Sequence, residues 1–376
     1  MAGHLISGEK RNTMFEGRTL TQLAQEIERQ AHDKRDFKAP TTMMQMSVIT
    51  PQDRLDDTPR QVKFQVGDIF DGSLNSLAHD HLGRWCGIPG PYYDRMLEEK
   101  PELLSFNVNA WLQSKERKET RLVRTLDGRA RAFLSHRYRT IDHDVVANAA
   151  LPVLIDESKK LGGVKIMSSE VTERRLYIKV VSERLTYEVK KGDAVQAGIS
   201  LSNSEVGQGS VKVEPFLYRL VCLNGAVIED SAVRKFHIGR SSAELGAAEE
   251  VFRDETREAD DKVFVMKLQD VLRAAFDDES FDQLKGLTID ASTRKIKKPV
   301  DDFVEEVVSV YKLNKGHKDS FLRNLIEGAD LTQWGVANAV TAIANTANDY
   351  ETATELERVG GAILAMDAGQ WKEIAA

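Results

Sequence analysis

The sequence predicts an α+β protein in which a mixed sheet core with helices precedes an acidic helical domain. Between 41 and 240, several segments alternate apolar and polar residues with period two, as half-buried strands do, and helical segments separate them. After 240 the apolar residues recur at helical spacing. The charge changes there as well: 1–240 hold 36 Lys/Arg against 32 Asp/Glu, and 241–376 hold 16 against 27. We predict an N-terminal extension with one amphipathic helix (1–40), an α+β core with a basic hairpin (41–240) and an acidic helical domain (241–376).

Each element has its own signal. Leu20, Leu23 and Ile27 follow helical spacing and predict the helix of the extension, over 19–31. Asp127-Gly128 separates two alternating segments and predicts a hairpin, because this pair readily adopts the positive backbone angles of a tight turn. Other helices are expected at 73–86, 92–100, 101–111, 145–160 and 300–311, and other strands at 62–66, 164–167, 176–181 and 186–189.

Composition excludes several classes of protein. Cys86 and Cys222 lie far apart and outside any zinc-ligand spacing, so we expect two small core residues in a reducing cytoplasm rather than a disulfide or zinc scaffold. No apolar run approaches the roughly 18 residues of a spanning helix, and the N-terminus lacks a long apolar stretch. A cytoplasmic protein without membrane insertion is therefore expected.

A basic segment is the strongest indication of a ligand. Residues 115–144 hold nine Lys/Arg against five acids, net +4, in a chain of formal charge −7. Arginine pairs bidentately with phosphate and aromatic rings stack on unpaired bases, which favours single-stranded nucleic acid. The alternative is a solvated hairpin paired to the acidic helices; both interpretations require exposure. The predicted nucleic-acid-binding residues are Arg121, Arg124, Arg129, Arg131, Phe133, Arg137, Tyr138 and Arg139.

Histidine and carboxylate groups give weaker signals. On a helix, His79 and His81 point about 200° apart and cannot easily hold one ion, so His81 is expected in the core. Asp142 and Asp144 stand at a helix start, where carboxylates cap exposed N–H groups. No metal site, cofactor or catalytic residue is predicted.

The segment 202–209 is rich in serine and glycine but lacks the lysine of a phosphate-binding loop, and its Glu205 would repel phosphate. A bulged turn between strands is the simpler interpretation. The alternative is a metal- or nucleotide-dependent enzyme acting on nucleic acid, in which Asn203, Ser204 and Glu205 act with Asp142 or His143. Whether the protein is an enzyme is left open, with a non-enzymatic role preferred.

Four ordered segments carry a family resemblance. They are Arg131-Ala-Phe-Leu-Ser-His-Arg-Tyr-Arg-Thr-Ile-Asp, Asn203-Ser-Glu-Val-Gly, Phe216-Leu-Tyr-Arg-Leu-Val-Cys-Leu-Asn-Gly and Trp334-Gly-Val-Ala-Asn-Ala-Val-Thr. Over 68–361 the chain resembles an uncharacterised phage- and plasmid-encoded family known as a domain of unknown function. The resemblance implies a mobile-element setting and transfers no activity. A weaker, fold-level analogy links the basic α+β core to phage single-strand annealing proteins.

We therefore expect a single-stranded DNA-binding protein that mediates strand annealing or recombination. A homo-oligomer is expected because the apolar helical faces at 300–311 and 334–343 offer more hydrophobic surface than one small domain readily buries. A structural or host-interaction protein, whose acidic half binds a basic partner, is the remaining alternative.

Overall fold

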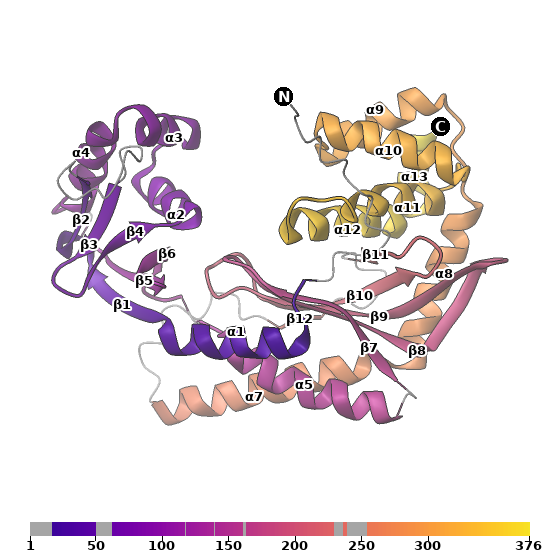
Figure 1. The fold of residues 1–376 in the computed structure, drawn as a ribbon, viewed down its shortest axis with the longest axis horizontal. Helices are drawn as coiled ribbons and strands as arrows, with labels where there is room; N and C mark the ends of the chain where they lie inside the picture. The colour runs from indigo at the N-terminus through magenta and orange to yellow at the C-terminus, as the bar shows by residue number, and fades with distance from the viewer. Residues whose placement is uncertain are drawn as a thin grey trace, which may run out of the picture.

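The computed structural model describes residues 17–49, 62–116, 118–138, 140–160, 163–228, 236–238 and 254–376. Two six-stranded sheets form its framework, and helices cover both (Figure 1). The predicted α+β class is confirmed. The boundary expected near residue 240 and the predicted ligand residue Arg139 lie outside the described residues.

The first sheet has the strand order β1-β5-β6-β4-β3-β2, and all neighbours are antiparallel except β4 and β6. Helices α2, α3 and α4 enclose a hydrophobic core with this sheet. The elements are β1 (Arg35–Pro40), the short 3-10 helix η1 (Thr41–Met43), β2 (Met44–Val48), β3 (Val62–Val66), β4 (Phe70–Leu74), α2 (Ser76–Cys86), α3 (Gly90–Glu99), α4 (Pro101–Leu112), β5 (Thr120–Leu126) and β6 (Arg129–Ser135).

Local sequence explains the boundaries of these elements. The Asn75 side chain caps the start of α2, and Gly87, in the left-handed conformation, ends the helix. Asp127 and Gly128 have φ values of 53° and 71°, which confirms the predicted tight turn between β5 and β6. A β-bulge between Arg124 and Thr125 shifts the register of this hairpin.

Helix α4 protects the edge strand β2. The Asn109 side-chain amide accepts from the backbone N–H of Met46 and donates to its carbonyl oxygen, both at 2.8 Å. One turn later, Gln113 donates to the Met44 carbonyl at 2.9 Å. The outward polar groups of the edge are thereby paired within the chain, which blocks edge-to-edge association of sheets.

The second sheet is antiparallel, in the order β11-β10-β9-β8-β7, with β12 paired to β10. Helices α1, α5 and α7 lie on one face, and α11 and α12 on the other (Figure 1). The elements are α1 (Leu20–Asp33), α5 (His143–Lys160), β7 (Val164–Val171), β8 (Leu176–Lys190), β9 (Asp193–Asn203), β10 (Val211–Arg219), β11 (Asn224–Val227), β12 (Phe236–Ile238), α7 (Asp254–Ala274), α8 (Asp278–Thr293), α9 (Val300–Tyr311), α10 (Lys315–Gly328), α11 (Gln333–Ala344), α12 (Tyr350–Ala365) and α13 (Ala368–Ala375).

The C-terminal helices pack on the second sheet through one large hydrophobic cluster. Phe303 and Val307 of α9, and Trp334 and Ile343 of α11, are buried within the chain. The expectation that these two faces exceed what the chain buries is therefore wrong, because the second sheet and its helices enclose them. These two helical faces therefore give no reason to expect an oligomer.

A buried ion pair lies between α12 and the sheet. The Lys179 ammonium of β8 pairs with the Glu357 carboxylate and donates to Thr354 Oγ1 at 3.1 Å. It also lies 4.7 Å from the ring centroid of Tyr350. Burial lowers the pKa of Lys179 and raises that of Glu357. These groups are inaccessible to solvent and fix α12 on the sheet.

The two cysteines differ in environment. Cys86 is buried in the first core, as predicted. Cys222 is exposed in the turn between β10 and β11, where its Sγ accepts from Arg219 Nη1 at 3.1 Å. The expectation of a core residue is wrong for Cys222, because the tight turn leaves its side chain outside both sheets.

Candidate nucleic-acid interface

Three of the predicted ligand residues are buried. Arg124 is fully buried, and Arg131 and Phe133 are nearly so. Phe133 packs edge-on against Phe64 and Trp85 in the core of the first sheet. The expected exposure of these residues is therefore wrong, because Phe133 lies in the core of the first sheet and Arg131 pairs with Glu205 on the loop after β9.

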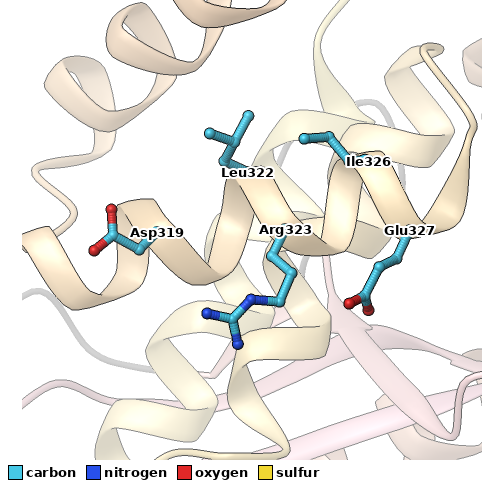
Figure 2. A pocket seen from close by; sticks show the side chains of 5 residues that line it. All are labelled: Asp319, Leu322, Arg323, Ile326 and Glu327. Atoms are coloured by element: carbon cyan, nitrogen blue, oxygen red, sulfur yellow. The ribbon is translucent and has the colours of Figure 1, made fainter.

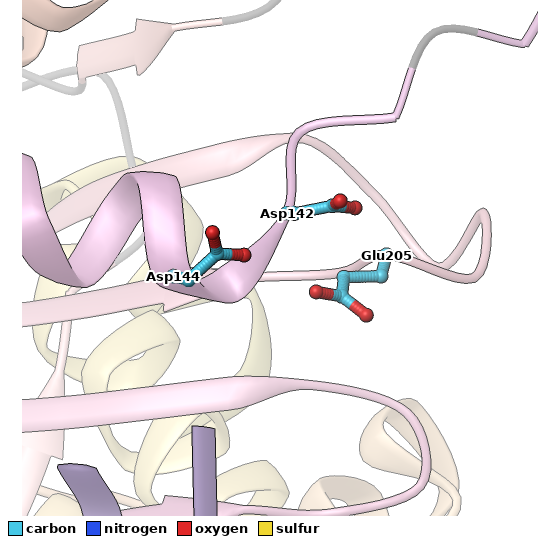
Figure 3. Close-up of side chains that lie close together, drawn as sticks. All are labelled: Asp142, Asp144 and Glu205. Carbon is cyan, nitrogen blue, oxygen red and sulfur yellow. The ribbon is translucent and has the colours of Figure 1, made fainter. Parts of the chain in front are cut away.

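The buried arginines belong to a cluster of ionised side chains between the two sheets, which we call the charged junction. Its carboxylates outnumber its cations by one. Asp142 and Asp144 extend from the start of α5 toward Glu205, on the loop after β9 (Figure 3). The charged junction comprises Lys34, Asp36, Arg124, Arg131, Asp142, Asp144 and Glu205.

Arg124 joins three segments of the chain. Its Nε donates to Asp36 at 2.9 Å, its Nη2 to Asp142 at 2.8 Å, and its Nη1 to the Glu205 carbonyl oxygen at 2.6 Å. All three branches of the guanidinium are thus committed to protein acceptors. Arg124 fixes β5 to the loop after β9, and its complete burial keeps it from a phosphate in solvent.

Glu205 is held in its charged form. One carboxylate oxygen accepts from Arg131 Nη2 at 2.5 Å and the other from the His143 backbone N–H at 2.6 Å. Burial alone would raise the pKa of Glu205, but His143 and Arg131 outweigh it and hold the pKa at about 2. A carboxylate with this pKa does not exchange protons near neutral pH, so it is unsuited to general acid–base catalysis.

The residues of the enzyme alternative do come together. His143 Nδ1 accepts from Asn203 Nδ2 at 3.0 Å, and Glu205 accepts from the backbone of His143. Burial lowers the pKa of His143 to about 4, so the imidazole is neutral at physiological pH. The hydrogen bonds of Asn203, His143 and Glu205 join these residues to one another and to the Ile141 carbonyl oxygen.

Lys34 occupies the position that a metal ion would take. Carboxylate oxygens of Asp142, Asp144 and Glu205 lie within 4.8 Å of one another. The Lys34 ammonium stands 2.7, 3.3 and 3.6 Å from these three groups, respectively. Burial alone would lower the pKa of Lys34, but the carboxylates raise it above its ordinary value. The chain thus supplies the counter-ion itself.

This arrangement predicts a result for metal titration. We expect wild-type protein to show no saturable binding of Mn²⁺ at the junction, whereas Lys34→Ala vacates the position between three carboxylates and binds the ion. Isothermal titration calorimetry measures both, and adding Glu205→Gln to Lys34→Ala serves as the control that removes a ligand. Saturable binding at the junction in wild-type protein would refute the assignment of Lys34.

The loop at 204–209 docks the second sheet onto the first. The Tyr138 hydroxyl donates to the Ser204 carbonyl oxygen at 3.3 Å and accepts from Gly207 N–H at 3.2 Å. Val206 enters a small core with Leu77 and Leu134. The backbone N–H groups of Val206, Gly207 and Gln208 donate to partners in the chain, so they do not cradle a phosphate in this conformation.

The other predicted ligand residues keep exposed surface. Arg129 is half-exposed, 3.5 Å from Glu173. Arg137 is exposed, and Tyr138 is half-buried. The guanidinium of Arg121 lies 4.9 Å from the centroid of the Phe133 ring, with part of its surface open.

Three arginines lie near the end of the first sheet at which β5 begins, and we call them the basic edge: Arg84, Arg121 and Arg137. Arg121 on β5 is in register with Ser135 on β6, and Arg137 follows two residues later. Arg84 precedes Trp85, whose indole N–H donates to Glu119 at 3.2 Å just before β5, so this end of α2 lies beside the start of β5. Sequence reasoning missed Arg84, because a single arginine on the exposed side of α2 carries no signal.

Two surface depressions on the C-terminal helices lack comparable chemistry. One, of about 470 Å³, is lined by side chains of α10 alone, with Leu322 and Ile326 beside charged neighbours (Figure 2). The other, of about 620 Å³, lies among α9, α10, α11 and α12 and mixes cations, carboxylates and amides. Neither gathers like charges or buried polar groups as the first sheet does.

Comparison with known proteins gives one match. A family model described as a domain of unknown function, DUF932, matches residues 132–358, more than half of the chain. The match begins within β6, ends on α12 and includes Asp142 and Glu205 of the charged junction. No curated protein and no solved structure matches the chain. Among the described residues, no helix is both long and apolar enough to cross a membrane.

Proposed function

The chain belongs to the DUF932 family, whose description assigns no function, and we propose from the geometry that it binds single-stranded nucleic acid along the basic edge. The observation that carries the proposal is the placement of three arginines near the start of β5: Arg121 itself, Arg137 just after its register partner Ser135, and Arg84 at the end of α2, next to the Trp85–Glu119 hydrogen bond. Arginine forks match phosphate oxygens, and three of them spaced along a surface suit a chain of phosphates better than a single anion.

The proposal separates two groups of arginines. Arg124 and Arg131 hold the two sheets together, and the basic edge contacts the ligand. Glu119, 3.5 Å from Arg121, is the nearby carboxylate that a bound phosphate would have to outcompete. Tyr138 is the predicted stacking residue that retains exposed surface, next to Arg137. Bases stacked on this ring would favour single strands, because duplex bases are already stacked.

Salt dependence tests the proposal directly. The double variant Arg84→Ala, Arg137→Ala is expected to weaken binding of single-stranded DNA and to flatten the slope of log K against log salt by about 1.4, about 0.7 for each lost phosphate contact. Fluorescence anisotropy over a salt series measures both quantities. Lys159→Ala, which removes an exposed cation of α5 remote from the edge, is the matched control.

The binding experiment compares three ligands. Single-stranded DNA, duplex DNA and RNA of equal length are compared at each salt concentration, and the proposal expects single strands to bind more tightly than duplex. If the double variant keeps both the affinity and the slope of wild-type protein, the basic edge is not the interface. Strand annealing, as in the phage annealing proteins, extends the proposal and requires two bound strands in one assembly.

A further inference from the structure

Helix α4 exposes large apolar side chains opposite its buried face, which is unusual for a helix at the surface of a soluble protein. Leu104, Val108 and Leu112 face the core of the first sheet. On the opposite side Phe106 is 74% exposed and Leu103 is 45% exposed. A helix with this composition is normally enclosed, so the outward side of α4 indicates a surface that another molecule covers.

The exposed residues form one continuous stripe, which we call the α4 stripe: Leu103, Phe106, Ala110 and Trp111. Leu103 is the centre of the stripe, since the other three lie three, seven and eight positions after it and each shares a face with it. Trp111 is 42% exposed. In the described part of the chain, the large aromatic side chains with high exposure are Tyr92 on α3 and the two of this stripe.

Charge differs between the two ends of α4. Residues 98–102, at the N-terminal end, hold three glutamates and one lysine, net −2. Residues 115–118, just after the C-terminal end, hold three cations and one glutamate, net +2. The stripe is thus flanked by an acidic end and a basic end. This pattern is self-complementary when the helix meets a copy of itself running in the opposite direction.

We infer that the α4 stripe is a dimer interface, in which α4 packs antiparallel against α4 of a second copy about a twofold axis. The apolar stripes then cover each other, and each acidic end faces the partner's basic end. A parallel pair would bring like charges together at both ends, which the charges oppose. A twofold interface uses one surface twice, so a single complementary stripe is sufficient.

The dimer goes beyond nucleic-acid binding and does not rest on it. It would still bear on the proposed function, because residues 115–118 lead directly into β5 and Arg121. In an antiparallel pair the two C-terminal ends of α4 are separated by about the helix length, about 18 Å for 12 residues. Two basic edges would then belong to one assembly, which supplies the two strand sites that annealing requires.

A charge placed in the stripe tests the apolar contact. Phe106→Glu is expected to raise the dimer dissociation constant at least about 30-fold, because a buried carboxylate would face an apolar surface without a partner. Sedimentation velocity at micromolar concentrations measures the mass. The matched control is Ile326→Glu, which adds the same charge at an apolar position of α10 that is 65% exposed, and it should leave the dimer intact.

Charge reversal tests the orientation and guards against misfolding. The N-end variant carries Glu99→Lys and Glu102→Lys, and the C-end variant carries Lys115→Glu and Lys118→Glu. Each variant alone places like charges at both contacts and should be monomeric. Mixed in equal amounts, the two should form a heterodimer, since every contact again joins opposite charges. Recovery of the dimer on mixing shows that both variants are folded.

Three results would overturn the inference. One is a wild-type protein that stays monomeric at micromolar concentration. Another is a dimer that survives Phe106→Glu but dissociates with Ile326→Glu, which would place the interface on α10. The third is failure of the two charge variants to associate on mixing while circular dichroism shows both to be folded. Because none of these measurements uses nucleic acid, they stand apart from the test of the basic edge.

Discussion

Arg131→Met is expected to lower the free energy of unfolding by about 3–5 kcal/mol, the cost of breaking a buried ion pair by removing one partner. The substitution keeps an unbranched, flexible side chain but leaves the Glu205 carboxylate buried without its 2.5 Å partner. Lys34, at 3.6 Å, compensates only in part. Urea denaturation followed by circular dichroism measures the change.

Arg129→Met provides the control for this prediction. Arg129 lies two residues away on the same strand, is half-exposed and pairs loosely with Glu173. Its replacement should change the free energy of unfolding by no more than about 0.5 kcal/mol. Equal effects of the two substitutions would show that the charged junction does not hold the sheets together. The double variant Arg131→Met, Glu205→Leu should be milder than Arg131→Met alone, since no unpaired charge remains.

Acid should destabilise the protein well above the range in which carboxylates usually titrate. Burial lowers the pKa of His79, His81 and His143 to about 4 each. In the unfolded chain these rings bind a proton near pH 6.5, and in the folded chain they do not. The contribution of these three histidines to the free energy of unfolding is therefore fully present above about pH 6.5. It falls as the pH drops from there toward 4. Glu205, with its pKa of about 2, acts in the same direction at lower pH.

His143 is the most buried of the three histidines and therefore gives the largest single loss of stability in acid. The difference between 6.5 and about 4 corresponds to about 3 kcal/mol at most. Melting temperatures measured from neutral pH down to about pH 4 should fall steadily, and His143→Gln should make that fall shallower, because glutamine still accepts from Asn203 and does not titrate. A stability that stays constant or rises as the pH falls over this range would contradict the prediction.

Local patterns predicted much of the fold. The Asp127-Gly128 turn, the helix that begins after Thr19 and the helix that ends at Gly87 all depend on residues within a few positions of one another. The predicted exposure of the residues on the basic strand was wrong for a physical reason. Alternation shows which residues share a face, but it does not show what covers that face, and here the cover is a loop more than 70 residues away in the chain.

The candidate site shows the same limit. The sequence shows Glu205 as a lone carboxylate in a segment rich in serine and glycine, but it predicts that Arg131 binds a ligand. The ion pair between the two residues is missed because it joins two sheets that the sequence does not relate. Lys34 carried no signal, since a lysine just after a helix is ordinary. Arg137 is exposed as predicted, whereas Arg121, at the end of the hairpin ladder, keeps only 17% of its side chain exposed.

The docking loop at 204–209 bears on the entropy of the proposed binding of nucleic acid. Its contacts with Tyr138, Arg124 and Arg131 tie the second sheet to the first through hydrogen bonds, an ion pair and a small core. Hinge bending between the sheets would break all of these at once. If the proposed interface is correct, its arginines stand on a frame held by these contacts, and the entropic cost of binding falls mainly on the nucleic acid, which adapts its shape to a surface that is already set.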